Sequence, residues 1–186
     1  MPSSQDTAPK VAKTKAAASA IAAPAASPVK DNLIQQLVDR YGDMVFDLCQ
    51  AVLWSQPNAQ LAFRAIIRDL RRLELAGVKY ERYERPWVLR VACEKLRSVA
   101  VRHGRTLSAS ERMMLDGALK GDARLRQFDS YFHRLRTNDQ ILLLLRDKYK
   151  LEYAEIAIIM GEPEGSLKMR RQHALRALDE MLWDTV

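Results

Sequence analysis

The chain has 186 residues, 48% of them hydrophobic, which is enough apolar content for one ordinary core or two small ones. Its 30 Lys and Arg exceed its 23 Asp and Glu, and the net charge of +7 favours a polyanionic partner such as nucleic acid or an acidic protein surface. Cys49 and Cys93 lie far apart and form no metal-ligand pattern, which excludes a disulfide scaffold and structural zinc. The longest apolar run, 141–145, is too short for a transmembrane helix.

Residues 1–30 form a separate kind of sequence, with ten Ala, four Pro, four Ser and four Lys. Such a segment buries too little apolar area to offset its ordering entropy, so we predict a disordered tail. A secretion signal is the alternative, because Lys10, Lys13 and Lys15 precede an Ala-rich run. Pro24 interrupts that run and it has no Leu-rich centre, so we expect a cytoplasmic protein in a reducing compartment.

Residues 31–103 show helical spacing of apolar residues and no strand-like alternation. Asp31 is a good N-cap for a first helix, and Pro57 suits the first turn of a second one. The predicted helices of this first domain cover 31–54, 57–77 and 86–102, with a loop over 78–86.

Residues 104–121 are rich in turn-forming residues and are the predicted linker, with some helix around 110–119. A second helical domain is predicted over 122–186, where apolar residues recur at helical spacing in four segments. The expected fold is therefore all-α, with two small helical domains joined by the linker.

The most specific motif lies between Leu151 and Leu178, where a short helix ends at Gly161 and a second helix follows a tight turn. This is the pattern of a helix-turn-helix, whose second helix enters the DNA major groove. A helical hairpin with a solvated basic face is the alternative. The predicted DNA-binding residues of the second helix are Gly165, Ser166, Lys168, Arg170, Arg171, His173 and Arg176.

A second candidate interface alternates bases with aromatics before and into the third helix: Lys79, Tyr80, Arg82, Tyr83, Arg85 and Trp87. Single-stranded DNA binding needs cations for the backbone and ring faces for the bases. The alternatives are that Trp87 anchors the core and that the bases are only solvated.

Catalysis has little support in the sequence. The histidines His103, His133 and His173 are scattered without triad or zinc-ligand spacing, and the glycines form no phosphate cradle. We expect no enzyme activity, no catalytic or metal-binding residue and no cofactor.

The stretch from Leu135 to Leu178 combines several further features: Leu135, the Leu-rich run before Arg146, Leu151-x-Tyr153-x-Glu155-Ile156-Ala157, Met160-Gly161, and Pro163-Glu164-Gly165-Ser166-Leu167-Lys168-x-Arg170 with Ala174 and Leu178. In these features the stretch resembles region 4 of bacterial sigma factors of the extracytoplasmic-function type, within the sigma-70 superfamily. The family usually has an aliphatic residue at the position of Arg171, which here either snorkels or adds a phosphate contact.

The first domain is similar to sigma region 2, through Tyr41-Gly42-Asp43-x-Val45-Phe46 and Pro86-Trp87-Val88-Leu89-Arg90-Val91-Ala92. It departs from the family pattern in its second helix, where family members carry an acidic surface that docks on polymerase. The positions matching that surface here, the predicted polymerase-docking residues, are Asn58, Gln60, Leu61, Arg64 and Arg68.

The resemblance implies a transcription initiation protein that binds core RNA polymerase through the β′ clamp and β flap. It also implies promoter DNA as a partner, with region 4 on the minus-35 element and region 2 on the minus-10 element, and it admits an anti-sigma factor. The altered second helix leaves an alternative open, namely a sigma-derived interaction module that does not initiate transcription, or a plain helix-turn-helix regulator.

Overall fold

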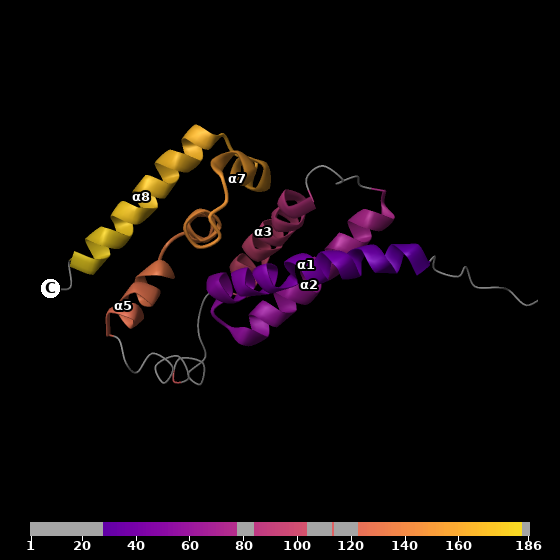
Figure 1. Ribbon diagram of the computed structural model, residues 1–186. Helices are drawn as coiled ribbons and strands as arrows, with labels where there is room; N and C mark the ends of the chain where they lie inside the picture. The colour runs from indigo at the N-terminus through magenta and orange to yellow at the C-terminus, as the bar shows by residue number, and fades with distance from the viewer. Residues whose placement is uncertain (1–27, 78–83, 104–112, 114–122, 184–186) are drawn as a thin grey trace, which may run out of the picture.

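The structure, a computed structural model, describes residues 28–77, 84–103, 113 and 123–183, and every regular element within these ranges is a helix. The predicted all-α fold is therefore confirmed. No described helix is long and apolar enough to cross a membrane. The elements in chain order are α1 (Pro28–Leu53), α2 (Gln56–Leu75), α3 (Glu84–His103), α5 (Ala123–Phe132), α6 (Thr137–Leu143), the π-helix η1 (Leu144–Lys148), α7 (Tyr153–Met160) and α8 (Glu164–Trp183) (Figure 1).

The helix boundaries follow local chemistry and differ from the predictions at two starts. The first helix begins at Pro28 rather than at Asp31, with proline in a first turn that needs no intrahelical N–H donor. The second helix begins as expected, because the Oγ of Ser55 accepts a hydrogen bond of 3.5 Å from the backbone N–H of Asn58. The predicted linker and nearly all of the predicted tail lie outside the described residues.

The third helix begins at Glu84, so the predicted loop over 78–86 is wrong at its C-terminal end, and Arg85 lies in the first turn of α3. An acidic first residue favours a helix start through the helix dipole. Pro86 is tolerated two residues later because the first turn has N–H groups without intrahelical partners anyway.

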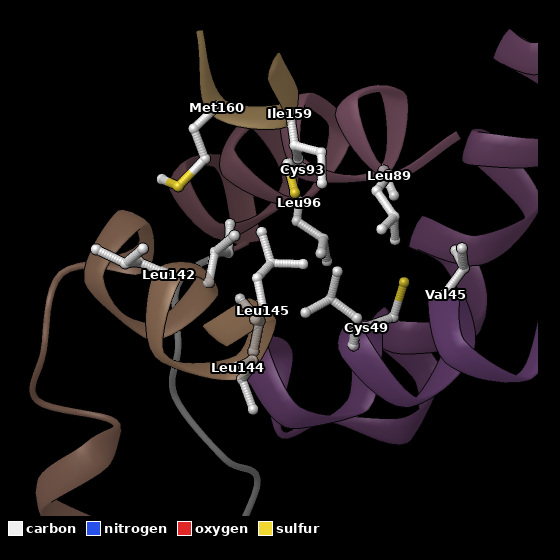
Figure 2. Close-up of a cluster of buried hydrophobic side chains, with 14 of the residues drawn as sticks. Val45, Cys49, Leu89, Cys93, Leu96, Leu142, Leu144, Leu145, Ile159 and Met160 are labelled. Carbon is white, nitrogen blue, oxygen red and sulfur yellow. The ribbon is translucent and has the colours of Figure 1, made fainter. Parts of the chain in front are cut away.

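One hydrophobic cluster receives side chains from helices on both sides of the predicted linker. Helices α1, α2 and α3 pack on one another, while α7 packs against α3 and α6 touches both α1 and α3 (Figure 1). Figure 2 shows Cys49 of α1, Leu96 of α3, Leu145 of η1 and Ile159 of α7 converging, and each is at most 1% exposed. Since a fully buried Leu or Ile contributes roughly 1.5–3 kcal/mol, this shared cluster holds the first and last helices together.

Charged groups also bridge α1 to η1. The Nζ of Lys148 lies 2.8 Å from Oδ1 of Asp47 and 2.7 Å from its Oδ2, and the hydroxyl of Tyr149 donates to the same carboxylate. Burial alone would raise the pKa of Asp47, but the hydrogen bonds from Lys148 and Tyr149 lower it below its ordinary value. Burial and the hydrogen bond to Asp47 in turn raise the pKa of Tyr149. The carboxylate therefore stays ionised and ties α1 to the end of η1.

Candidate nucleic-acid interface

The predicted helix-turn-helix is formed by α7, a tight turn and α8. Helix α7 ends at Gly161, which adopts a left-handed φ of 70° and donates its N–H to the carbonyl of Ala157 at 2.9 Å. Glycine takes this conformation without a Cβ penalty, so the chain reverses immediately after α7. The turn then places Glu164 at the start of α8.

The orientation of α8 follows from its periodicity of 100° per residue. Leu167, Ala174 and Leu178 are buried against the other helices. The side turned away from them is exposed and is hereafter the outward face: Gly165, Met169, Gln172, His173 and Arg176. Three of these five were predicted to bind DNA, whereas Met169 and Gln172 were not.

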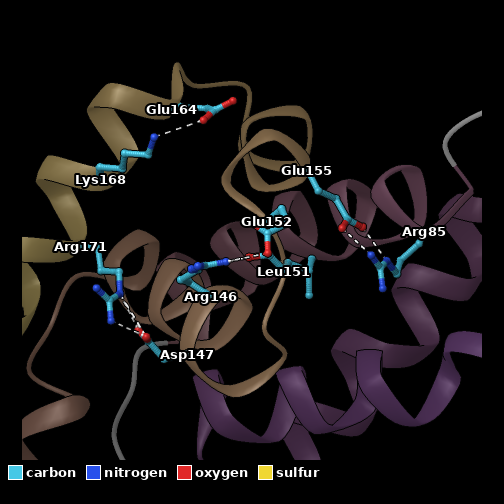
Figure 3. Close-up of polar contacts among 9 residues, drawn as sticks. All are labelled: Arg85, Arg146, Asp147, Leu151, Glu152, Glu155, Glu164, Lys168 and Arg171. Carbon is cyan, nitrogen blue, oxygen red and sulfur yellow. Dashed lines mark hydrogen bonds and ion pairs between the residues drawn. The ribbon is translucent and has the colours of Figure 1, made fainter.

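Lys168 lies at the flank of the outward face. Its Nζ is 3.4 Å from Oε2 of Glu164 one turn earlier (Figure 3). The same Nζ lies 5.3 Å from the centre of the Tyr153 ring. Exposed pairs of this kind are weak, so the ammonium group remains available to an anionic ligand.

Arg170 has a different environment from Lys168. Its Nη1 lies 2.6 Å from Oε1 of Glu162 in the turn, and its Nε lies 3.6 Å from Oδ1 of Asp139 in α6. Burial raises the pKa of Asp139 and the charge of Arg170 opposes that rise. Arg170 therefore fastens the turn and α6 to α8.

Arg171 reaches η1 instead of the outward face. Its Nη2 donates to Oδ1 of Asp147 at 2.6 Å and its Nε donates to both carboxylate oxygens at 3.0 and 3.1 Å (Figure 3). These hydrogen bonds raise the pKa of the guanidinium. Where the sigma family has an aliphatic residue, this chain has a multiply bonded ion pair.

A hollow of about 500 Å³ runs beside α8, lined on one side by Ser166, Met169 and His173. Its opposite wall is formed by the start of α6, where Arg136 lies. Helical spacing from Arg176 would have found Met169 and Gln172 in the sequence, because they lie seven and four residues before it. Arg136 has no such sequence signal, since tertiary packing alone brings it to α8.

Solved structures of other proteins share the fold of this chain. No family model and no curated protein matches the sequence. The solved structure of CnrH in complex with the cytosolic domain of CnrY is similar, with a TM-score of 0.64 and 17% identity over 84% of this chain and 91% of that chain. So is the sigma factor RpoE in complex with the anti-sigma factor NepR from Bartonella quintana, with a TM-score of 0.62 and 16% identity over 81% of this chain and 97% of that one.

The fold is that of an extracytoplasmic-function sigma factor. The structure describes only part of the second predicted DNA interface, the set of bases and aromatics between Lys79 and Trp87. Lys79, Tyr80, Arg82 and Tyr83 lie outside the described residues.

The two described members of that set are both occupied by contacts within the chain. Arg85 forms a bidentate ion pair with Glu155 of α7 (Figure 3), and hydrogen bonding to that carboxylate raises the pKa of Arg85. Trp87 is half-buried against the hydrophobic cluster, as the core-anchor alternative expects. The structure thus ties Arg85 to the helix-turn-helix through Glu155.

The predicted docking residues lie along α2. Asn58 is half-buried near the helix start, whereas Gln60, Leu61, Arg64 and Arg68 are exposed. Leu61 is 51% exposed, which rules out a core role. The first turn of α2 has no acidic residue, so the surface is neutral to basic as its sequence indicates.

Within the described ranges no three His, Cys, Asp or Glu side chains gather into a metal site. Burial raises the pKa of Cys49 and that of Cys93 to about 12, so both thiols stay protonated at neutral pH. Both cysteines are buried in the hydrophobic cluster.

Proposed function

We propose that the protein is a sigma-factor-like transcription initiation protein that binds core RNA polymerase and recognises promoter DNA. The observation that carries the proposal is the outward face of α8, which follows a glycine-capped turn and presents His173 and Arg176 without an ion pair to any other described residue. A helix placed in this way after a short first helix is the reading element of helix-turn-helix proteins.

The side chains of α8 suit distinct roles on duplex DNA. Gln172 can form paired hydrogen bonds to an adenine edge, and Arg176 can contact guanine or a phosphate. Gly165 leaves room for close approach, since a Cβ there would meet nothing within 4 Å. We assign this face to the minus-35 element, and we keep Lys79, Arg82 and their aromatic neighbours as candidates for the minus-10 element.

The same fold supports a set of proposed protein partners. Helix α2 is the proposed docking surface for the β′ clamp, and the last helices are proposed to meet the β flap. The two similar structures are complexes with the cytosolic domain of CnrY and with the anti-sigma factor NepR. We therefore include a protein regulator of the anti-sigma kind among the proposed partners. We also propose a cytoplasmic location and a role without catalysis.

Duplex binding is tested first, by fluorescence anisotropy over a salt titration. The variant Lys168→Ala/Arg176→Ala removes two cations that contribute little to folding, and it should weaken binding by tenfold or more and lower the salt slope by about 1.8 units. The variant Arg71→Ala/Arg72→Ala removes two exposed cations from α2 and is the matched control. Parent-like binding by the α8 variant at every salt concentration would overturn the DNA-reading role.

A second candidate function is a sigma-derived module that binds polymerase without initiating transcription. The neutral-to-basic first turns of α2, with Leu61 exposed, favour it because an acidic docking surface is missing. Co-purification with core polymerase followed by run-off transcription on genomic fragments separates the two. A transcript supports initiation, whereas polymerase binding without any transcript supports the module.

A further inference from the structure

A hollow of about 460 Å³ lies beside α5, where α5 packs on α8 (Figure 1). Four segments build it: the end of α1, the helix α5, the junction of α6 with η1, and the second half of α8. We call it the α5 pocket, and none of its apolar residues belongs to a predicted DNA-binding or docking set. The apolar residues that the argument uses are Trp54, Phe128, Phe132, Leu144, Leu175 and Leu178.

The apolar wall of the α5 pocket has a buried floor and an open mouth. Phe132, Leu144 and Leu178 are at most 9% exposed, whereas Phe128 is 44% and Leu175 is 39% exposed. The rings of Phe128 and Phe132 are stacked, with their centres 6.1 Å apart. A concave apolar site of this size, bordered by a few polar groups, is the usual form of a small-molecule site.

The charges at the border of the α5 pocket select the kind of ligand. Arg171 is bonded to Asp147, and Lys148 is bonded to Asp47 of α1. Asp129, the fourth charged residue of the border, forms no ion pair with another described residue. The pocket therefore presents one carboxylate that no cation of the described part of the chain compensates.

Trp54 brings an aromatic ring to this carboxylate. Burial raises the pKa of Asp129, and a hydrogen bond from Trp54 opposes that rise. The φ of Trp54 is 59°, which is rare for a bulky residue, and its ring centre lies 3.7 Å from that of His133. Backbone strain of this kind persists where the surrounding structure holds it, and it is frequent in ligand sites.

We propose that the α5 pocket binds a small aromatic amine, with the ammonium group on Asp129 and the ring against Trp54 and Phe128. A carboxylate forms strong hydrogen bonds with an ammonium group, and the faces of aromatic rings attract the same charge. An anionic ligand would be repelled by Asp129, and a neutral one would bury the carboxylate further without compensating its charge.

This inference goes beyond the proposed function, because it involves neither DNA nor polymerase. Trp54 lies before the predicted linker, whereas Phe128 and Leu175 lie after it. A ligand bound between them therefore stabilises the contact between the two halves of the chain, and it should raise the melting temperature as its concentration increases.

The first test is isothermal titration calorimetry of the full chain with naphthylethylamine and with its neutral match, naphthylethanol. The amine should bind about tenfold more tightly than the alcohol, because hydrogen bonds between charged groups are stronger than neutral ones. Naphthylacetate, which has the same ring and a negative charge, should bind more weakly than either. Equal affinity for the three compounds, or no binding of the amine, overturns the proposal.

The variant Asp129→Asn tests the carboxylate directly. It should weaken amine binding by about tenfold and leave alcohol binding within about twofold. Its melting temperature without ligand should not fall, because burial opposes the ionised form of Asp129 in the folded protein. Asp43→Asn removes an exposed carboxylate from α1 and is the matched control. Amine binding by Asp129→Asn that equals that of the control overturns the assignment.

The variant Leu175→Ala tests the apolar wall. It should weaken the binding of the amine and of the alcohol by the same factor of about threefold or more, since both lose the same apolar contact. Leu75→Ala, which truncates an exposed leucine at the end of α2, is the control and should bind both compounds as the parent does. Parent-like binding by Leu175→Ala would place the ligand elsewhere and overturn the pocket.

Sedimentation equilibrium without ligand tests a competing occupant, a second copy of this chain. If the parent is a dimer that Leu175→Ala converts to a monomer, the apolar wall is an interface between copies and the assignment to an amine is overturned. A parent that is monomeric and loses its preference for the amine only in Asp129→Asn supports the proposal. None of these measurements uses DNA or polymerase, so their outcome is independent of the proposed function.

Discussion

Helices α2 and α8 have the same length and the same number of Lys and Arg residues, yet most of these cations are paired with acids in α8 and not in α2. Each spans 20 residues and carries four Lys or Arg. In α8, Lys168, Arg170 and Arg171 each hold a carboxylate, whereas the exposed Arg64 and Arg68 of α2 form no ion pair with another described residue. The difference lies in the acids placed nearby and not in the bases themselves.

This contrast shows how each helix is positioned. Helix α2 is held by its apolar side, where Ala62, Ile66 and Leu70 are at most 1% exposed. Helix α8 has three buried side chains against five in α2, and it adds bridges to η1, α6 and the turn. Partly exposed pairs are individually weak, but a guanidinium bonded to two segments fixes direction as well as distance. The proposed DNA-reading role of α8 depends on such a fixed orientation, because its side chains must meet base edges at defined positions.

The largest expected effect tests whether the two helices belong to one cooperative unit. Ile66→Ala in α2 and Ile156→Ala in α7 each remove a fully buried side chain, and each should lower the free energy of unfolding by about 2–5 kcal/mol. Because both residues contribute to one hydrophobic cluster, chemical denaturation should show a single transition that either change shifts. Two transitions, each shifted by only one variant, would contradict this coupling.

The matched control for that comparison is Leu61→Ala. Leu61 is 51% exposed on α2, so its truncation should change the free energy of unfolding by less than about 0.5 kcal/mol. A larger loss would mean that this position is covered in solution, and that α2 has fewer exposed docking residues than the structure indicates.

The next effect concerns the turn that sets the direction of α8. Gly161→Ala forces a Cβ into a left-handed conformation and should cost about 1–2 kcal/mol of stability. Gly165→Ala, inside the first turn of α8 and without a steric neighbour, should instead be neutral or stabilise by up to about 1 kcal/mol. Thermal unfolding of the two variants measures the difference. If the two variants change the stability equally, the left-handed conformation of Gly161 does not determine the orientation of α8.

A smaller effect separates the partnered cations of α8 from the solvated ones of α2. Asp147→Asn weakens the hydrogen bonds of Arg171 and should lower the free energy of unfolding by about 1 kcal/mol, since both side chains are partly exposed. Arg68→Gln should change it by only a few tenths. Equal losses in urea denaturation would show that the bridges do not distinguish the two helices.

The sequence predicts much of this fold because most of its local signals agree. Pro57 and Gly161 mark boundaries that the structure confirms, and the helix-turn-helix follows from their spacing with the apolar residues. The ion pairs of Arg85 and Arg171 were not predictable, because their acids lie 70 and 24 positions away and meet them only through tertiary packing. Met169 lies on the same face as Arg176, seven residues before it, so helical spacing predicts its position although its side chain is uncharged.

The smallest expected effect is a pH-dependent one at Asp47, the acid that joins α1 to η1. Its pKa is lowered in the folded protein, so its contribution to stability is complete above the unfolded value of about 3.9 and is lost as pH falls through the folded value. Asp47→Asn should therefore cost a few tenths of a kcal/mol at pH 7, because the carboxylate is partly exposed. Below about pH 4 the variant and the parent should converge.

Urea denaturation at pH 7 and at stepwise lower pH measures that difference. Asp43 lies exposed on the same helix and has no ion pair with another described residue, so Asp43→Asn is the control for removing one carboxylate from α1. A pH-independent gap for Asp47→Asn would mean that its ionised carboxylate does not stabilise the contact between α1 and η1. The contact between α1 and η1 would then depend on packing in the hydrophobic cluster and not on the charge of Asp47.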